Sequence, residues 1–193
     1  MPKSIKYAVI LLIIVLAGGG IYLRTPAPAS FDRDAAFEAA KEYDARIIRD
    51  KFGVPHIYGA RDSDVAFGLA YAHAQDDWAT IEEVVFFSRG ELAKYKGKEA
   101  AIPDYLVGAL HITRDVREKY ERDLSSKTRA LVEAYAAGAN LWCAEEQNRC
   151  TPGAAPVTPY DVVAGFVSRT PFFYGLDEHL TKIFEGDVET VKA

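Results

Sequence analysis

A strand hairpin followed by a helix of small residues, within residues 46–97, constrains the fold of this chain more than any other feature. Residues 47–48 and 54–58 have the composition of strands, and the Phe-Gly pair at 52–53 between them is a turn signal. Because Pro55 has no N–H to donate to a neighbouring strand, the second strand is expected to be an edge strand or to begin there. The segment therefore predicts an antiparallel β-hairpin.

The residues after the hairpin predict two helical stretches in succession. Residues 62–64, Asp-Ser-Asp, are of the type that caps a helix N-terminus. After the Gln-Asp-Asp sequence at 75–77, a second stretch carries Trp78, Ile81 and Val85 on one face. Small side chains in the first stretch would allow other backbone to approach closely: Ala66, Gly68, Ala70, Ala72 and Ala74.

In order and spacing, these segments resemble the start of the α chain in the penicillin amidase family, which includes penicillin and acyl-homoserine lactone acylases. The matching residues are the hairpin sequence at 47–62, the helix AFGLAYAHAQDDW at 66–78, Arg-Gly-Glu-Leu-Ala at 89–93 and Lys-Gly at 96–97. The resemblance extends roughly from Ala45 to Leu180. Members of the penicillin amidase family are N-terminal-nucleophile (Ntn) hydrolases, each made as one precursor that cuts itself into α and β chains.

The resemblance implies an α+β fold. Residues 30–193 would form a mostly helical α-chain lobe with a β-hairpin, incomplete without its β chain. Together the two chains would build a four-layer α-β-β-α Ntn-hydrolase sandwich.

The resemblance also implies that the catalytic residues lie on the partner chain. In the family, a serine that follows a glycine becomes the N-terminus of the β chain, and its free α-amino group, with a pKa of about 8, acts as the base. No serine of this chain follows a glycine, so we assign no catalytic residue to it and expect it to stop at or just before the processing site. The expected partner is a β chain with an N-terminal serine, and the expected substrate is a small N-acyl amide.

No other hydrolytic site is evident in the sequence. The histidines are His56, His73, His111 and His179, and neither a G-x-S-x-G motif nor the H-x-x-x-H spacing of a zinc site occurs. We therefore expect His73 to be a packed histidine and His56 to have a structural role. A non-catalytic, membrane-anchored periplasmic interaction domain, or a relic α fragment that lacks its β half, is the alternative function.

By resemblance, Phe173 and Tyr174 contribute to the acyl-binding pocket, with Tyr174 at the position of the family's mobile aromatic residue. Phe173 stands where the family often has a basic residue, which favours an apolar acyl chain over a carboxylate-bearing penicillin nucleus. Both could instead be ordinary core aromatics. Glu178 is a candidate calcium ligand, although one acid is a weak signal for an ion that takes six to eight oxygens; the chemistry itself requires no cofactor. Penicillin, cephalosporin, acyl-homoserine lactone and other N-acyl amides all remain open as substrates.

Residues 1–29 predict export from the cytoplasm. Lys3 and Lys6 precede a run without charge at 7–23, and Ala-Pro-Ala at 27–29 has the spacing of a signal-peptidase site. A cleaved signal peptide and a retained membrane anchor are both open, and either one would place the remainder in the periplasm. That remainder holds 20 basic and 28 acidic residues, a formal charge of −8, which argues against nucleic acid as a partner.

Cys143 and Cys150 fit such an oxidising compartment. Seven positions apart in a loop-like stretch, they are expected to form a disulfide, with free thiols as the alternative. A metal site is disfavoured because the spacing is not C-x-x-C and no histidine lies nearby.

The remaining chain predicts helices and loops. Ser125 or Ser126 should cap a helix whose stripe of Leu131, Tyr135, Gly138 and Trp142 belongs to the core, and residues 101–111 should be a loop or short strand. A further helix should begin with Thr-Pro-Tyr-Asp at 158–161 and end or kink at the proline at 171.

Overall fold

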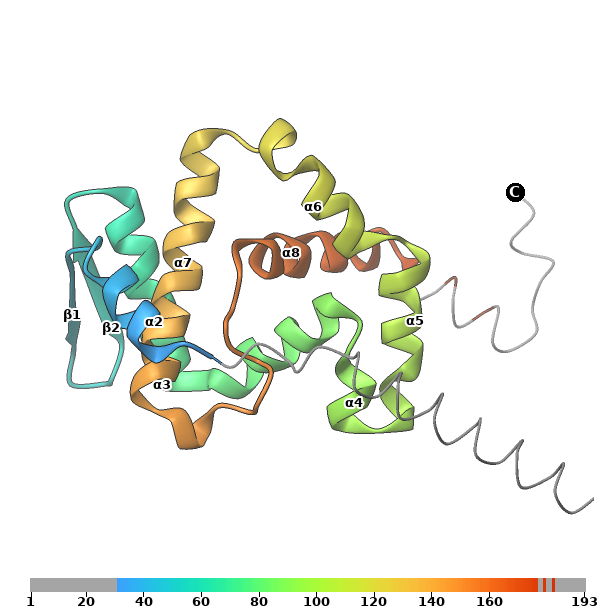
Figure 1. Cartoon of the computed structure of the whole chain (residues 1–193), viewed down its shortest axis with the longest axis horizontal. Coiled ribbons are helices and arrows are strands. Elements are labelled where there is room, and N and C mark those ends of the chain that lie inside the picture. The colour runs from blue at the N-terminus through green and yellow to red at the C-terminus, as the bar shows by residue number, and fades with distance from the viewer. Residues whose placement is uncertain (1–30, 177–178, 180–181, 183–193) are drawn as a thin grey trace, which may run out of the picture. The chain divides into compact units, whose positions relative to one another are not determined.

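The protein is described by a computed structural model that covers residues 31–176, 179 and 182. Within these residues it is mostly helical, with one two-stranded antiparallel sheet (Figure 1). This confirms the mostly helical lobe with a β-hairpin. In chain order, the elements are α2 (Arg33–Ala40), β1 (Ala45–Arg49), β2 (Pro55–Gly59), α3 (Asp62–Arg89), α4 (Leu92–Lys96), the 3-10 turn η1 (Lys98–Ala100), α5 (Ala101–Ala109), α6 (Ile112–Asp123), α7 (Ser126–Glu145), the 3-10 turn η2 (Gln147–Arg149) and α8 (Pro159–Phe173).

The predicted hairpin is confirmed. β1 and β2 pair in a register that places Ala45 opposite Gly59 and Arg49 opposite Pro55. The carboxylate of Asp50 accepts hydrogen bonds from the backbone N–H groups of residues 52 and 54, at 2.8 and 3.0 Å, and so closes the turn. Pro55 is the first residue of β2, where its missing N–H costs the sheet nothing.

Helix α3 consists of two helical halves, as the sequence predicts. Asp77 has non-helical backbone angles (φ −151°, ψ 66°), and its carboxylate accepts the N–H of Thr80 at 3.2 Å and the hydroxyl of Thr80 at 2.6 Å. Asp77 therefore caps the second half. At the start of α3 the prediction is wrong by one position, because the N-cap is Arg61 and Asp64 takes the third helical position.

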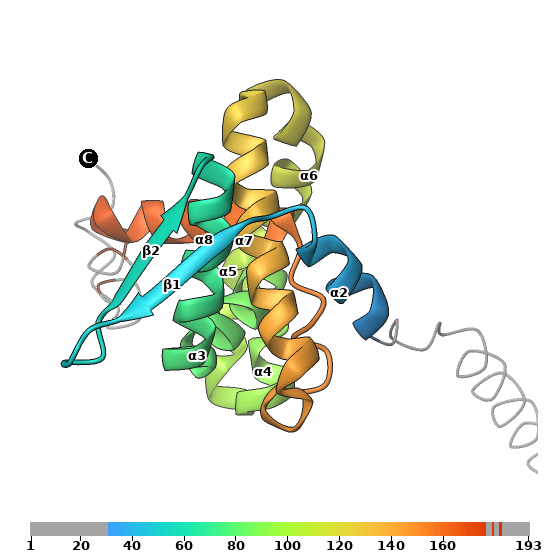
Figure 2. The same cartoon turned by 90° about the vertical axis from the view of Figure 1, so that its left-hand side faces the viewer.

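Small residues allow the close packing of α3 on its neighbours. A Cβ atom at Gly68 would lie 2.8 Å from Ile57 of β2 and 3.0 Å from Ala45 of β1, so glycine lets the hairpin rest directly on α3. Figure 2 shows the two strands in front of the first half of α3. On α7, a Cβ atom at Gly138 would overlap the backbone carbonyl of Phe67, so glycine allows α3 and α7 to approach closely here.

The prediction for residues 101–111 is wrong, and the predicted end of the last helix is a few residues too early. Residues 101–109 form helix α5 rather than a loop, because Pro103 stands in the first turn, where its missing N–H would have no helical partner. Helix α8 continues through Pro171 to Phe173, at the cost of one backbone hydrogen bond, and ends in a tight turn from the N–H of Tyr174 to the carbonyl of Pro171. The predicted caps at Ser125 of α7 and Thr158 of α8 are confirmed.

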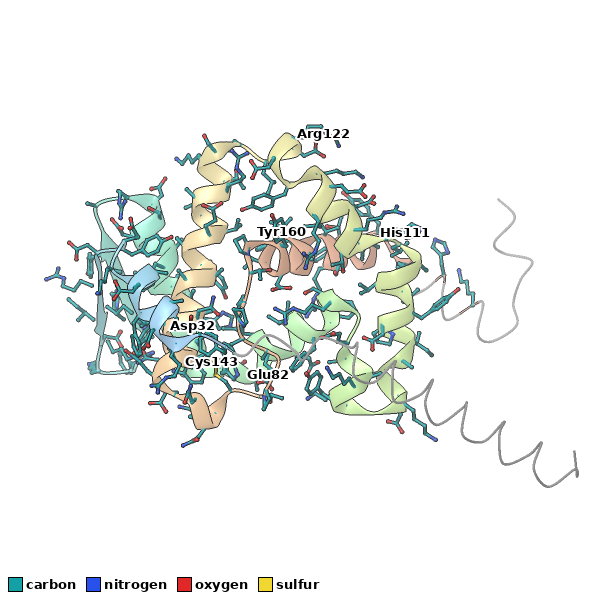
Figure 3. All side chains as sticks on the ribbon, viewed as in Figure 1. Asp32, Glu82, His111, Arg122, Cys143 and Tyr160 are labelled. Carbon is teal, nitrogen blue, oxygen red and sulfur yellow. A yellow bond between two sulfur atoms is a disulfide. The ribbon has the colours of Figure 1, made fainter. Side chains whose placement is uncertain are left out.

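The segment after α7 is fastened to α7 by a disulfide and to α3 by hydrogen bonds. Cys143 and Cys150 are joined as a disulfide with their Cα atoms 5.9 Å apart. Directly beyond it, the N–H and hydroxyl of Thr151 donate to the carboxylate of Glu82 at 2.8 and 2.7 Å, and the indole of Trp78 donates to the same carboxylate. Figure 3 shows Glu82 and Cys143 at the same end of the molecule.

Asp64 connects the N-terminus of α3 to the chain that enters the hairpin. Its carboxylate is almost fully buried and accepts hydrogen bonds from the guanidinium and N–H of Arg61 and from the N–H of Asp44. The guanidinium of Arg61, together with the two backbone N–H groups, lowers the pKa of Asp64 to about 2. Ionised Asp64 therefore stabilises the folded chain.

This pKa gives a testable acid dependence. A carboxyl group whose pKa is lower in the folded than in the unfolded chain adds stability above its unfolded value, near 4, and loses it as pH falls toward about 2. We expect Asp64→Asn to be less stable than wild type at pH 6, with the difference shrinking steadily below pH 4. Urea unfolding of both proteins at several pH values measures this difference. A difference that stays constant with pH would show that the charge of Asp64 contributes nothing.

The proposed signal peptide or anchor at residues 1–29 lies outside the described residues. No helix within the described part of the chain is long and apolar enough to span a bilayer.

Candidate functional site

An apolar groove of about 530 Å³ lies between α3, α7 and α8. Both halves of α3 line it, as do the first half of α7 and one face of α8. We call this surface the α3-α7-α8 groove. Its large apolar residues are Leu69, Ile81, Val84, Val85, Leu131, Val132, Val157, Val162 and Phe166.

His73 and Tyr135 form the polar pair of the groove. Nδ1 of His73 lies 2.8 Å from the hydroxyl of Tyr135, and both side chains are half-buried. Burial raises the pKa of Tyr135, so its phenol stays neutral at physiological pH. His73 is thus a packed histidine, as predicted. The prediction that Leu131 and Tyr135 belong to the core is only partly right: Gly138 and Trp142 are buried, whereas these two line the groove.

The face of α8 that lines the groove continues along the helix as far as Phe173. Val162, Phe166 and Arg169 recur at steps of four and three residues, and Phe173 follows four residues further on the same face. Phe173 and Tyr174 themselves lie outside the groove and are 86% and 83% exposed. They are not core aromatics of this chain, and their role in an acyl pocket stays a prediction.

A largely buried ion pair fixes the N-terminal end of α8. The guanidinium of Arg89, the last residue of α3, donates to both carboxylate oxygens of Asp161 at 2.8 and 2.7 Å and to the carbonyls of Gly153 and Pro156, each at 2.8 Å. Burial alone would lower the pKa of Arg89, but the hydrogen bonds and charge of Asp161 outweigh it and the pKa is raised. Arg89 therefore stays charged and holds α8 against the end of α3.

Asp161 also completes the cap of α8. Its carboxylate accepts the N–H and the hydroxyl of Thr158, both at 2.7 Å, while the Thr158 hydroxyl oxygen accepts the N–H of Asp161 at 3.2 Å. Figure 3 marks this end of the helix at Tyr160. One buried carboxylate thus both caps the helix and pairs with Arg89.

Other sequence-predicted residues add no chemistry to this groove. His56 is half exposed on the hairpin, with Nε2 at 3.5 Å from a carboxylate oxygen of Asp50. His111 lies between α5 and α6, at a positive φ of 54° (Figure 3). Glu178 falls outside the described residues, and within those residues no cluster of three histidine, cysteine or acidic side chains could hold a metal ion.

The Arg89–Asp161 pair and the groove itself were not predicted from the sequence. The pair joins residues 72 positions apart, and no local pattern links them. The groove did leave a signal in the repeat of Val162, Phe166 and Arg169 along α8, which marks one helix face.

A sequence model of the penicillin amidase family, described as "Penicillin amidase", matches residues 44–176. The chain therefore belongs to the penicillin amidase family of Ntn hydrolases. This confirms the resemblance carried by the hairpin and helix α3.

Its curated relatives include acylases of two kinds. Acyl-homoserine lactone acylase PvdQ of Pseudomonas fluorescens is 31% identical over 125 residues, which is 61% of this chain and 16% of that protein. Penicillin acylase 2 proenzyme of Pseudomonas sp. is 33% identical over 99 residues, which is 51% of this chain and 13% of that protein. The curated relatives compared are much longer proteins, of which the chain spans between 11% and 18%.

The fold is similar to that of a solved acylase structure. A chain of the thermostable penicillin G acylase from Alcaligenes faecalis superimposes with a TM-score of 0.52 at 24% identity, covering 65% of this chain and 71% of that chain. At this identity the likeness shows the fold alone.

Proposed function

We propose that this chain is the α subunit of an exported N-acyl amide hydrolase whose catalytic serine is the N-terminal residue of a separate β chain. The observation that carries the proposal is the family match across residues 44–176. The relatives named as acylases, one of them as a proenzyme, extend far beyond the matched segment. The chain itself has no serine that follows a glycine, so the nucleophile has to come from elsewhere.

In the proposed enzyme, the β-chain serine attacks the carbonyl carbon of the substrate amide while its own α-amino group accepts the hydroxyl proton. The amine leaves with a proton, and water then releases the acyl group from the serine. Donors on the β chain would stabilise the oxyanion of each tetrahedral intermediate. No step needs a metal, and the two chains together would form the four-layer α-β-β-α sandwich.

The α chain would supply one wall of the acyl pocket through Phe173 and Tyr174. Two neighbouring aromatic side chains that are more than four-fifths exposed favour this role, because a covering chain would bury them. The apolar Phe173 favours an uncharged acyl group. Acyl-homoserine lactones and penicillins, named for two sets of relatives, are both N-acyl amides that such a site could accept.

Activity of the separated and combined chains tests the proposed function. We expect residues 30–193 alone to show no turnover of chromogenic phenylacetyl or long-chain acyl amides. Co-expression with the coding sequence beyond Ala193 should restore turnover, and that sequence should contain a Gly-Ser junction. Turnover by residues 30–193 alone would contradict the two-chain arrangement, and no junction would favour a non-catalytic domain.

Tyr174→Leu should redistribute acyl specificity in the αβ enzyme. One methylene in an apolar pocket changes the activation free energy by about 1–3 kcal/mol, so removing a phenol ring should raise kcat/KM for longer acyl groups relative to short ones. The measurement is kcat/KM across an acyl-length series. Tyr105→Leu is the matched control, because Tyr105 is 73% exposed on α5, away from the groove. An equal loss for every substrate would assign Tyr174 to assembly instead of selection.

A further inference from the structure

The α3-α7-α8 groove exposes large apolar side chains at its rim. Leu69 of α3 is 50% exposed and Phe166 of α8 is 74% exposed, and both line the groove. Such a surface is costly in water, and a contiguous apolar depression of this kind marks an interaction site.

Several polar side chains of the groove are hydrogen-bonded within the chain, and Arg169 of α8 adds a positive charge to the lining. His73 and Tyr135 bond to each other, Thr80 bonds to Asp77, and Asp161 is held by Arg89. Sites for small ligands combine apolar walls with a few polar groups that orient the ligand. Because these groups are engaged with one another and the remaining lining is mostly apolar, the groove favours the apolar side chains of a protein segment over a small polar ligand.

From these observations we infer that the α3-α7-α8 groove is the docking surface for an apolar segment of the β chain; this inference rests on the proposed function. The described chain spans less than a fifth of the length of its curated relatives, so most of the protein that could cover the groove lies outside it. The groove face of α8 continues to Phe173, two turns beyond Phe166. A segment seated in the groove would therefore lead directly to the proposed acyl wall.

Charge substitutions at the rim test this docking surface. Leu69→Glu and Phe166→Glu are to be made in the α chain co-expressed with the proposed β chain. Substitutions at hot-spot positions of an interface typically weaken association by tenfold or more. We therefore expect at least a tenfold loss of αβ affinity in pull-down and titration of the separated chains. Phe166→Ala should weaken association less than Phe166→Glu. Tyr105→Glu, the same change on an equally exposed aromatic outside the groove, should associate as wild type does.

Folding and hydrolysis are measured alongside association. The separated α chain should melt at the wild-type temperature in all four variants, since each side chain is already half or more exposed. Unchanged αβ affinity in the two groove variants would overturn the docking surface. Wild-type αβ affinity combined with altered binding of decanoic acid would overturn it too, because the groove would then be a ligand site. Self-association of the α chain that Phe166→Glu abolishes would also overturn it, because a second copy would then occupy the groove.

The same measurements separate this inference from the proposed function. If groove variants lose the β chain but the wild-type complex hydrolyses no N-acyl amide, the docking surface stands and the proposed function fails. If the wild-type complex is active and the groove variants assemble normally, the function stands and the docking surface fails.

Discussion

Replacing Arg89 with alanine is expected to lower the free energy of unfolding by about 3–5 kcal/mol. The change removes two hydrogen bonds to Asp161 and leaves that carboxylate buried beside the end of α3. It also removes the donors to the carbonyls of Gly153 and Pro156, so the loop before α8 loses its contact with α3. The cost of an unpaired buried charge exceeds the modest net gain of the intact pair, which is why the single substitution is so damaging. Chemical denaturation of the chain measures the effect.

Three further variants show whether the buried pair is the cause. Arg89→Lys keeps the charge but cannot form the bidentate contact, so it should fall between wild type and Arg89→Ala. The double substitution of Arg89 and Asp161 by alanine should cost less than the sum of the two single ones, because it leaves no unpaired charge. Arg114→Ala, which breaks an exposed ion pair with Asp115, should leave unfolding unchanged. Equal effects of Arg89→Ala and Arg114→Ala would refute the argument from burial.

Gly138→Ala is expected to destabilise the chain by about 1–3 kcal/mol or more, although alanine is the better helix former. In an unpacked helix, glycine to alanine gains about 1 kcal/mol. At Gly138 the new methyl group would overlap the carbonyl of Phe67 and lie 3.1 Å from Cβ of Ala70. These are backbone and near-backbone atoms of α3 and cannot rotate away, so the steric cost decides the sign. Thermal unfolding measures it.

Gly108 of α5 supplies the matched control. A Cβ atom there meets no heavy atom within 4 Å. Gly108→Ala should therefore be neutral or stabilise by up to about 1 kcal/mol, according to helix propensity alone. If both substitutions change stability in the same direction and by the same amount, the close approach of α3 and α7 does not limit the packing.

Local signals account for the parts of the fold that the sequence predicted correctly. The turn at 52–53, the caps at Ser125 and Thr158, and the polar break at 75–77 each act within a few residues, so their outcome follows from short-range chemistry. Residues 101–111 were predicted to be a loop or short strand because of Pro103, but proline is compatible with a first helical turn as well as with a loop. Pro171 is a different case: it stands in the last turn of α8, and the helix continues to Phe173 despite the lost backbone hydrogen bond.

The candidate site was harder to predict because its parts are distant in sequence. The groove combines α3 with α7 and α8, and the Arg89–Asp161 pair spans 72 positions, so both depend on tertiary packing. The roles of Phe173 and Tyr174 came from family resemblance, and in the structure both are largely exposed and lie outside the α3-α7-α8 groove. In the proposed enzyme their role depends on a partner surface, which one chain's sequence does not encode.

The anchoring of α8 at one end has a consequence for how such acylases diverge. The bonds of Arg89 and Asp161 are concentrated at the first turn of the helix, whereas Phe173 and Tyr174 at its far end are exposed and add little to the stability of this chain. Substitutions at these two positions therefore carry little folding cost, and in the proposed enzyme selection can act on substrate choice without first restoring stability. Under that proposal, the α chain separates the residues that keep it folded from those available for evolutionary change in specificity.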